Sequence, residues 1–315
     1  MTRYCYVGSL IFACILACSG IIGCGTAKSA VHKVVNLSSR AASSVAGTIL
    51  PDKPGLKKRV MVLSLIDYSG LAPGLGERVA ADFSERLARS DEIVVFRPKN
   101  KEEWSIRNKS PRFGIVNDPE LVKKAAGLNM NALITGVFDV IKTKTKKTGI
   151  WPFRKSWNVY EVLTVINVID PMTGTLLLSK SESGEFLTHS NPGSMGNKEL
   201  VEQLFDNALP RVLKKEASLV CEKLEKSPWT GKILAVENDT IKINAGKDVG
   251  VDTGCRFEVF ERGDAIPSQS GMVYVPVGKK RGEIRVTSVM DTYSLAKPVT
   301  KGIFCENQTI RPVIN

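Results

Sequence analysis

The chain has 315 residues, of which 43% are hydrophobic and 24% are charged, and it carries a formal net charge of +12. This composition is ordinary for a globular protein and excludes disorder along the whole length, while the length leaves room for about two domains. The positive charge is spread along the chain, which argues against a nucleic-acid-binding arm. Anionic lipid headgroups or acidic envelope polymers are the expected counter-charges, and a solvated lysine-rich surface is the equal alternative.

The amino terminus is typical of a bacterial secretion signal. A basic start, Met1-Thr2-Arg3, precedes an apolar run from Tyr4 to Ile22, and small and polar residues follow Cys24. Ile21-Ile22-Gly23-Cys24 resembles a lipobox, whose cysteine takes a diacylglyceryl thioether before the signal is removed. We therefore predict that residues 1–23 are a lipoprotein signal peptide and that Cys24 is lipidated.

Three alternatives to that assignment stay open. The apolar run approaches the roughly 20 residues that span a bilayer, so an uncleaved anchor also fits. Cys24 could be one more cysteine of a cysteine-rich signal. Ile15-Leu16-Ala17-Cys18 fits the lipobox too, but cleavage before Cys18 would leave apolar Gly20-Ile21-Ile22 in the mature linker, so Cys24 is preferred.

Gly25-Thr26-Ala27 contains no aspartate, which in the enterobacterial sorting pattern is compatible with the outer membrane.

Residues 24–57 predict a flexible tether, because they are rich in serine and end in Pro51-Asp52-Lys53-Pro54-Gly55. Residues 58–227 predict a mixed unit of strands and helices, with Asp118 as a helix N-cap before proline. The expected elements are, in chain order, strand 59–67, helix 77–89, strand 93–96, a helix from residue 119, strands 132–138, 160–170 and 175–179, and a long helical segment 197–226 that Pro210 should kink or split.

Residues 228–315 have a different texture, with short alternating runs and frequent glycine. The expected strands are 231–236, 240–246, 257–260 and 282–286. Apolar and polar residues alternate between turn signals, which predicts a small antiparallel barrel. The fold class expected for the whole chain is α+β.

Two resemblances support this division. Val60 to Asp67, Gly74 to Val79 and Ala132 to Val137, with Val168-Ile169-Asp170 before Thr173-Gly174, resemble the family that groups the TolB amino-terminal domain with the curli-secretion lipoprotein CsgG. That resemblance implies a mixed sheet with flanking helices.

The terminal unit resembles the carboxy-terminal domain of the flagellar assembly protein FlgT. The residues that carry this are Gly231-Lys232-Ile233, Ile241 to Gly246, Gly250-Val251 with Gly254, Phe257 to Phe260, Ser270-Gly271, and Gly282-Glu283-Ile284 with Val286. The resemblance implies a small SH3-like barrel.

Three of the 7 cysteines, Cys221, Cys255 and Cys305, lie outside the signal region. No C-x-x-C spacing occurs, so a zinc site is not expected. Cys255 and Cys305 stand where the FlgT resemblance implies an aspartate near a glycine. In an oxidising periplasm these two could pair as a disulfide with Cys221 free, and mass spectrometry with and without reductant tests the pairing.

No catalytic constellation emerges from the sequence. The two histidines, His32 and His189, leave a Ser-His-Asp triad or a histidine metal site without partners. The loop from Gly70 to Gly76 lacks the lysine and Ser/Thr of a Walker loop and predicts a tight turn instead. Carboxylate pairs such as Glu182 with Glu185 are expected to be surface charges. We predict no enzyme activity, cofactor or metal.

A basic segment followed by aromatic residues extends one predicted hairpin. It contains Lys142, Lys144, Lys146 and Lys147, then Trp151, Phe153 and Trp157. Such a mixture suits a membrane interface or the acidic surface of a partner. The alternative is a soluble hairpin whose tryptophans fold back on the sheet. Lysines alternate with threonines and leave no lipid-facing apolar row of about ten residues, which argues against a pore formed by this chain.

Taken together, these patterns predict a non-enzymatic, periplasm-facing outer-membrane lipoprotein that acts as a structural or assembly component of an envelope machine. The FlgT resemblance implies a flagellar ring, and the CsgG/TolB resemblance implies a homo-oligomer with protein partners. A component of a CsgG-like secretion complex and an activator of a cell-wall synthase are the alternatives.

Overall fold

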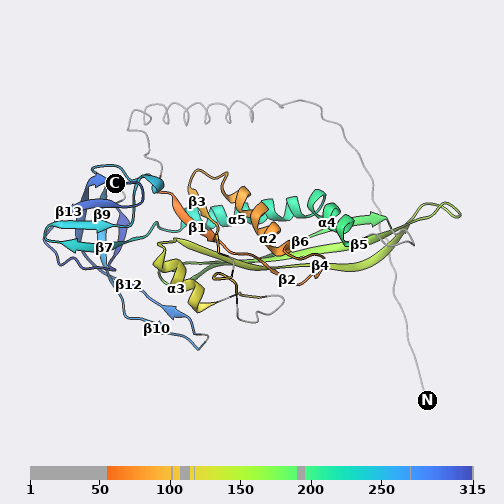
Figure 1. Cartoon of the computed structure of the whole chain (residues 1–315), viewed down its shortest axis with the longest axis horizontal. Helices are drawn as coiled ribbons and strands as arrows, with labels where there is room; N and C mark the ends of the chain where they lie inside the picture. Colours follow the sequence, from red (N-terminus) through yellow and green to blue (C-terminus); the bar gives the residue numbers. More distant parts are fainter. Residues whose placement is uncertain are drawn as a thin grey trace, which may run out of the picture. The chain divides into compact units, whose positions relative to one another are not determined.

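The computed structural model describes residues 55–100, 102–106, 114–116, 118–189, 196–269 and 271–313 (Figure 1). The predicted signal peptide, most of the predicted tether, and both candidate lipidation sites, Cys24 and Cys18, lie outside the described residues.

A mixed sheet forms the first part of the described chain. Its strands are β1 Lys58–Val62, β2 Ile66–Asp67, β3 Ile93–Phe96, β4 Ala132–Thr148, β5 Lys155–Ile169 and β6 Leu176–His189. The spatial order is β3-β1-β4-β5-β6, with β2 also paired to β4. β1 is parallel to β3 and β4, whereas β4, β5 and β6 form an antiparallel meander. The predicted meander is confirmed, and its strands run beyond the apolar segments because pairing continues through polar residues.

The aliphatic run at 59–67, expected to be one strand, is two. Both β1 and β2 pair in parallel with β4. Val62 and Ile66 are four residues apart along the chain, whereas their partners on β4, Ile134 and Val137, are three residues apart. One extra residue therefore interrupts the ladder, as in a bulge. Leu63 and Leu65 are buried in this break and Ser64 between them is exposed, so the hydrophobic pattern carried no sign of it.

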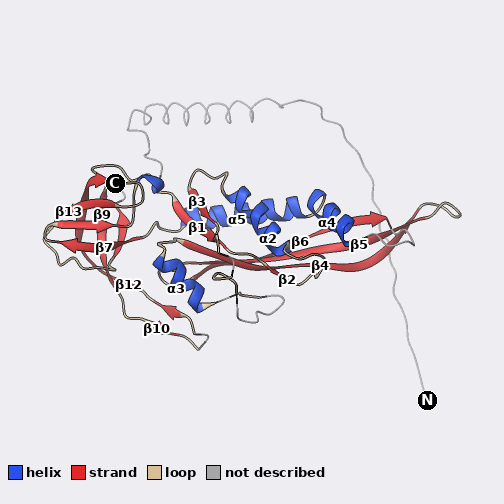
Figure 2. Ribbon diagram, viewed as in Figure 1, coloured by secondary structure: helices blue, strands red, loops and turns tan. Residues whose placement is uncertain are grey.

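Helices cover both faces of the sheet, as Figure 2 shows. α2 Leu75–Leu87, α4 Asn197–Asp206 and α5 Leu209–Lys226 pack on one face, and α3 Pro119–Gly127 lies on the other. The buried stripe of α2 recurs at helical spacing, so one side of the helix faces the strands. This side contributes Val79, Phe83 and Leu87 to the larger core.

The long helical segment is split, as Pro210 predicted. α4 ends at Asp206 and α5 starts at Leu209, so the proline stands in the first turn of α5. A proline there lacks only an N–H that would have no helical partner, and its fixed φ suits the helix start. The break therefore precedes the proline instead of centring on it.

The glycine loop before α2 serves a close approach of backbone to backbone. Gly74 has φ 74° at the N-cap of α2, a conformation that favours glycine. A Cβ on Gly76 would lie 2.1 Å from the carbonyl oxygen of Leu65. The helix can begin this close to the chain after β1 only because that position has no side chain. This close approach explains the glycines of the loop, and no bound phosphate is needed to explain them.

The second part of the described chain is a closed antiparallel barrel in the order β12-β13-β8-β7-β14-β9. Its strands are β7 Gly231–Glu237, β8 Thr240–Ile243, β9 Arg256–Arg262, β12 Val277–Val289, β13 Ser294–Pro298 and β14 Thr309–Pro312. A short hairpin, β10 Ile266–Pro267 with β11 Val273–Tyr274, projects between β9 and β12. The small barrel is confirmed, while β13, β14 and the hairpin were not predicted because their segments are short and only partly apolar.

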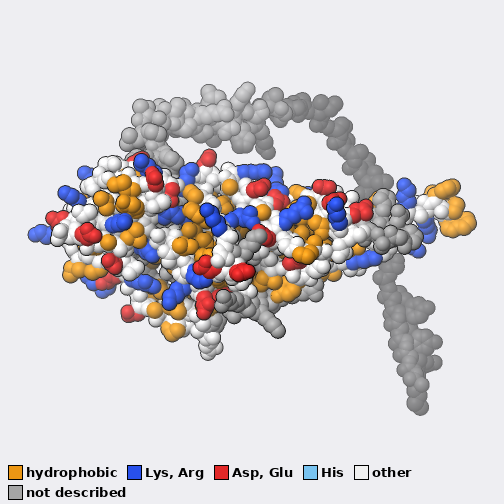
Figure 3. Space-filling view, viewed as in Figure 1, with side chains coloured by type: hydrophobic (Ala, Val, Ile, Leu, Met, Phe, Trp, Pro, Cys, Tyr) orange, Lys and Arg blue, Asp and Glu red, His pale blue; other side chains and the backbone are white. Residues whose placement is uncertain are grey.

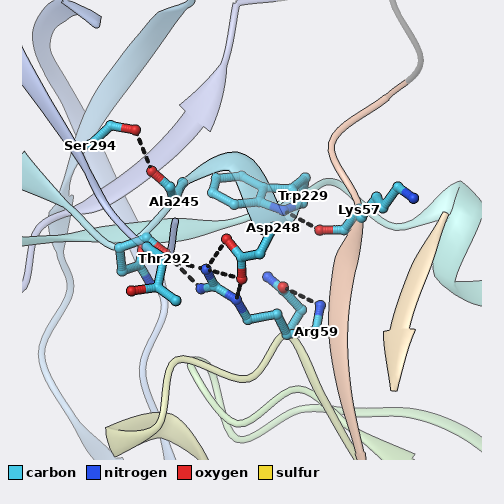
Figure 4. Close-up of polar contacts among 9 residues, drawn as sticks. Lys57, Arg59, Trp229, Ala245, Asp248, Thr292 and Ser294 are labelled. Atoms are coloured by element: carbon cyan, nitrogen blue, oxygen red, sulfur yellow. Dashed lines mark hydrogen bonds and ion pairs between the residues drawn. The ribbon is translucent and has the colours of Figure 1, made fainter. Parts of the chain in front are cut away.

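Arg59 joins the sheet to the barrel within the one compact unit, Pro54–Asn315, that contains all described residues (Figure 4). Its guanidinium is buried, and Nε and Nη2 donate to the two carboxylate oxygens of Asp248 at 2.8 and 2.9 Å. Nη1 donates to the carbonyl oxygen of Asn244 at 2.6 Å. Planar two-point pairing of this kind fixes orientation as well as distance. Nearby, the indole of Trp229 donates to the carbonyl of Lys57 at 3.1 Å.

Candidate interaction surface

The outer half of the β4–β5 hairpin gathers the residues that the sequence singled out. In β4 the residues from Ala132 to Asp139 are buried and those from Ile141 to Thr148 are exposed. The change coincides with the change from aliphatic residues to lysine and threonine. The hairpin is therefore anchored by its inner half and presents its outer half to the surroundings.

The strand register decides which face each lysine occupies. Lys144 pairs with Val159 and Lys146 with Trp157, after an irregularity at Thr143, whose hydroxyl donates to the carbonyl of Val159 at 3.2 Å. Cross-strand partners share a face, and on β5 these positions alternate with those that pack against α5. Lys144 and Lys146 therefore lie on the sheet face opposite α5.

Apolar side chains form the tip of the hairpin. Ile150 is 84% exposed, Trp151 79% and Phe153 84%, and the amide of Phe153 donates to the carbonyl of Ile150 at 2.8 Å to close the turn. In Figure 3 the hydrophobic end of this arm projects beyond a group of lysine and arginine side chains. Large apolar side chains this exposed and this close in sequence are typical of a contact surface.

Trp157 differs from the other two predicted aromatic residues. It lies within β5, is only partly exposed, and its indole donates to the hydroxyl of Thr148 at 2.9 Å. Trp157 thus belongs to the ladder of the arm, whereas Trp151 and Phe153 form its apolar end and do not fold back onto the sheet.

The arm carries an excess of positive charge. Lys144 lies 3.8 Å from the carboxylate of Glu185. Across the part of the chain that the structure describes, no ion pair forms at Lys142, Lys146, Lys147, Arg154 or Lys155. These cationic residues, with Lys144, form a collar next to the apolar tip. An apolar tip with a cationic collar suits anionic headgroups or an acidic protein surface.

The cysteines of the described chain are free thiols. Cys255 is partly buried at the edge of the barrel core, where its sulfur accepts a bond from the amide of Asp252 at 3.4 Å, and Cys305 is exposed. Burial and nearby carboxylates raise the pKa of the Cys221 thiol on α5. The Cys255–Cys305 disulfide is not formed in this structure and stays a prediction for the oxidised protein.

The carboxylates Glu182 and Glu185 do not act as a pair. Glu182 of β6 forms an ion pair with Lys215 at 2.6 Å and lies near Glu216, both residues of α5. Glu185 lies instead beside Lys144. Glu216 is buried and accepts a hydrogen bond from Thr164 at 2.6 Å. Burial, with a smaller contribution from Glu182, raises the pKa of Glu216 to about 8. This cluster lines neither the cavity of about 280 Å³ beside Trp104 nor the groove of about 570 Å³ beside α3.

Among the described residues, no three His, Cys, Asp or Glu side chains are grouped so as to hold a metal ion. No helix among the described residues is both long enough and apolar enough to cross a bilayer. Sequence reasoning missed Arg59. Its one signal was an arginine at the head of an otherwise aliphatic strand, a position where an unpaired charge would be costly.

No protein-family model matches the chain, and no curated protein matches it. Solved structures resemble parts of it. The hypothetical protein CT253 from Chlamydia trachomatis is 14% identical, with 54% of this chain and 100% of that chain covered and a TM-score of 0.37. The PelC dodecamer from Paraburkholderia phytofirmans is 16% identical, with 52% and 92% covered and a TM-score of 0.29. Lipoprotein GNA1162 from Neisseria meningitidis is 17% identical, with 54% and 99% covered and a TM-score of 0.27. Similarities this low assign neither a family nor a function.

Proposed function

We propose that this chain is an outer-membrane lipoprotein whose folded part docks onto a periplasmic assembly and catalyses no reaction. The observation that carries the proposal is the hairpin tip, where Ile150, Trp151 and Phe153 are exposed next to Lys146 and Lys147, which form no ion pair with any described residue. Aromatic side chains that lose water on contact dominate the energy of many interfaces. A collar of cations adds attraction to an acidic surface and speeds the encounter.

The lipid on Cys24 supplies the other half of this mechanism. A diacylglyceryl group holds the amino terminus at the membrane, and the part of the predicted tether before the compact unit, which begins at Pro54, sets how far the folded part can move from it. Position relative to the membrane is then the function, with the hairpin as the contact that completes it.

The machine proposed is the ring around the periplasmic rod of the flagellar motor, with several copies of the chain in the ring. The resemblance of residues 228–315 to the FlgT carboxy-terminal domain supports this choice. An export complex and a synthase activator remain the other candidates. Neither face of the outer half of β4 carries an apolar row: Lys144 and Lys146 lie on one face, and Thr145 and Lys147 lie on the other. A membrane strand needs an apolar face toward the lipid, so this favours a docking role over a channel.

Crosslinking in intact cells tests the docking role. A photoreactive amino acid in place of Trp151 should give discrete adducts, and under the flagellar proposal one of them contains a ring component. The matched control is the same amino acid in place of Ile303, an apolar residue of the barrel that is 75% exposed but lies away from the hairpin. Equal adducts from both positions, or none from Trp151, would contradict docking through the tip.

Two further experiments separate the parts of the proposal. Cys24→Ser should release the protein from the outer membrane, and unchanged fractionation would move the anchor to Cys18 or to the apolar run. Flotation of the Cys24→Ser protein with phosphatidylglycerol vesicles, but not with phosphatidylcholine vesicles, would assign the tip to the membrane itself if replacing Trp151 and Phe153 by serine abolishes it. A deletion strain with fully functional flagella would overturn the flagellar assignment while leaving the docking role to the crosslinking result.

A further inference from the structure

A groove of about 570 Å³ lies where α3, the β5–β6 turn and the barrel meet. Pro119 and Val122 of α3 form one wall, Met172 of the turn a second, and Val273 of the β10–β11 hairpin a third. This volume is in the range of pockets that hold small molecules or short peptide segments. No residue of the hairpin tip lines it, so the groove is a separate surface from the proposed docking contact.

The hairpin that closes the groove is held in place by the turn beneath it. The amide of Val275 donates to the carbonyl of Thr173 at 3.0 Å, and a Cβ on Gly174 would lie 2.3 Å from the carbonyl oxygen of Val273. Met272 is buried in the core under α3. The wall is therefore preformed, which lowers the entropic cost of binding.

The charge that lines the groove is positive. Lys123, Lys232 and Arg262 border it, against a single carboxylate, Glu120. Lys232 donates to the carbonyl of Ala126 at the end of α3 at 3.3 Å, and in the described chain Arg262 has no hydrogen-bonded or ion-paired partner for its guanidinium. Partial burial and the nearby charge of Arg262 lower the pKa of Lys232. Two cations that repel each other across a half-apolar groove are stabilised by an anion between them.

We propose that this groove binds a short acidic segment of a partner protein, with its carboxylate at Arg262 and Lys232 and a neighbouring apolar side chain against Met172 and Val273. Methionine adapts to apolar side chains of different shape, and an arginine fork matches a carboxylate at two points. The charge excludes the cationic hairpin tip of a second copy as the occupant, although its aromatic side chains would suit the apolar walls.

A selection from random heptapeptides displayed on phage, against the purified full-length chain in detergent, tests the proposal. The enriched peptides should place Asp or Glu beside Leu, Met or Phe, and raising the salt concentration should weaken their binding. Arg262→Ala should lower the affinity of the best peptide about tenfold or more, and Arg262→Lys should retain part of it. Met172→Glu should also weaken binding, because the new carboxylate would occupy Arg262.

The matched control is Arg285→Ala, since Arg285 is an exposed arginine of the same barrel that does not line the groove. Trp151→Ser should also leave the peptide affinity unchanged, which keeps this test independent of the tip of the β4–β5 hairpin. Enrichment of neutral or basic peptides, or an Arg262→Ala protein with full affinity and unchanged thermal unfolding, would overturn the proposal. Dodecanoate that binds the wild-type protein more tightly than every peptide, and fails to bind Arg262→Ala, would assign the groove to a lipid anion instead.

Discussion

The two halves of β4 follow one another in the same strand and differ in almost every physical property. Residues from Ala132 to Asp139 pack under α2 and α5 on one face, and on α3 and the segment at Val116 on the other. The first three of them pair with β1, whose Arg59 is bonded to the barrel. Residues from Ile141 to Thr148 pair only with β5, carry four lysines and lead to an apolar tip.

Stability and contact are therefore assigned to opposite ends of one hairpin. Burial of aliphatic side chains stabilises the inner half, whereas the outer half is held by backbone pairing and leaves its side chains for another molecule. Substitutions in the two halves should therefore have separable consequences, and four predictions test that separation.

The largest effect is expected at the inner end, at Arg59. Arg59→Ala leaves the carboxylate of Asp248 and the carbonyl of Asn244 without their buried partner, so the free energy of unfolding should fall by about 3 to 5 kcal/mol. Urea unfolding followed by circular dichroism measures it, with Arg285→Ala as the control, expected within about 0.5 kcal/mol of wild type. Equal losses in both variants would show that the Arg59 contact has no special role.

The second effect depends on pH and concerns Glu216. Its pKa is about 8 in the folded chain against an ordinary value of 4.5, so the folded state holds the proton more tightly than the unfolded state. This contribution to stability is fully present below about pH 4.5 and is lost as the pH rises through about 8, at roughly 1.4 kcal/mol per pH unit between them.

Glu216→Gln cannot ionise and should remove that slope, whereas Glu202→Gln, an exposed glutamate of α4, should keep it. The measurement is the free energy of unfolding across this pH range. Parallel curves for wild type and Glu216→Gln would mean that Glu216 is ionised in the folded protein.

The third effect is expected in docking alone. Replacing both Trp151 and Phe153 by serine removes exposed apolar side chains, so the free energy of unfolding should change by less than about 0.5 kcal/mol. The same protein, with a photoreactive residue at Ile150, should lose the adducts that form when Trp151 and Phe153 are present. A destabilisation comparable to that of Arg59→Ala would place the tip among the stabilising parts of the fold.

The smallest effect is expected from the lysines of the collar, in the yield of crosslinked adducts. Lys146→Glu with Lys147→Glu should reduce adduct formation a few-fold at low salt and have little effect at high salt, because exposed charges act over about 10 Å at 0.1 M salt and less above it. Thr145→Ser, between alternating lysines, is the neutral control. Loss of adducts that is independent of salt would indicate a direct packing role for these lysines.

Local sequence patterns predicted much of the fold. Asp118 accepts bonds from the amides of Glu120 and Leu121, as an N-cap before Pro119 should, and Pro210 stands in the first turn of α5. The meander and the small barrel follow from alternation over short segments. The break between β1 and β2 did not, because a bulge depends on the register of the partner strand, which the run itself does not encode.

For the candidate site, the sequence was enough to predict the composition of the hairpin, with cations first and aromatic residues next, because strand alternation and a turn place neighbouring residues together. The exposure of Trp151 and Phe153, and the place of Trp157 in the ladder, became clear from the folded structure. It alone brought Arg59 to Asp248, which are 189 residues apart, and Arg262 to the groove beside α3. Periodicity reports the neighbours of a residue along its own element, whereas these contacts depend on the packing of elements that are distant in the chain.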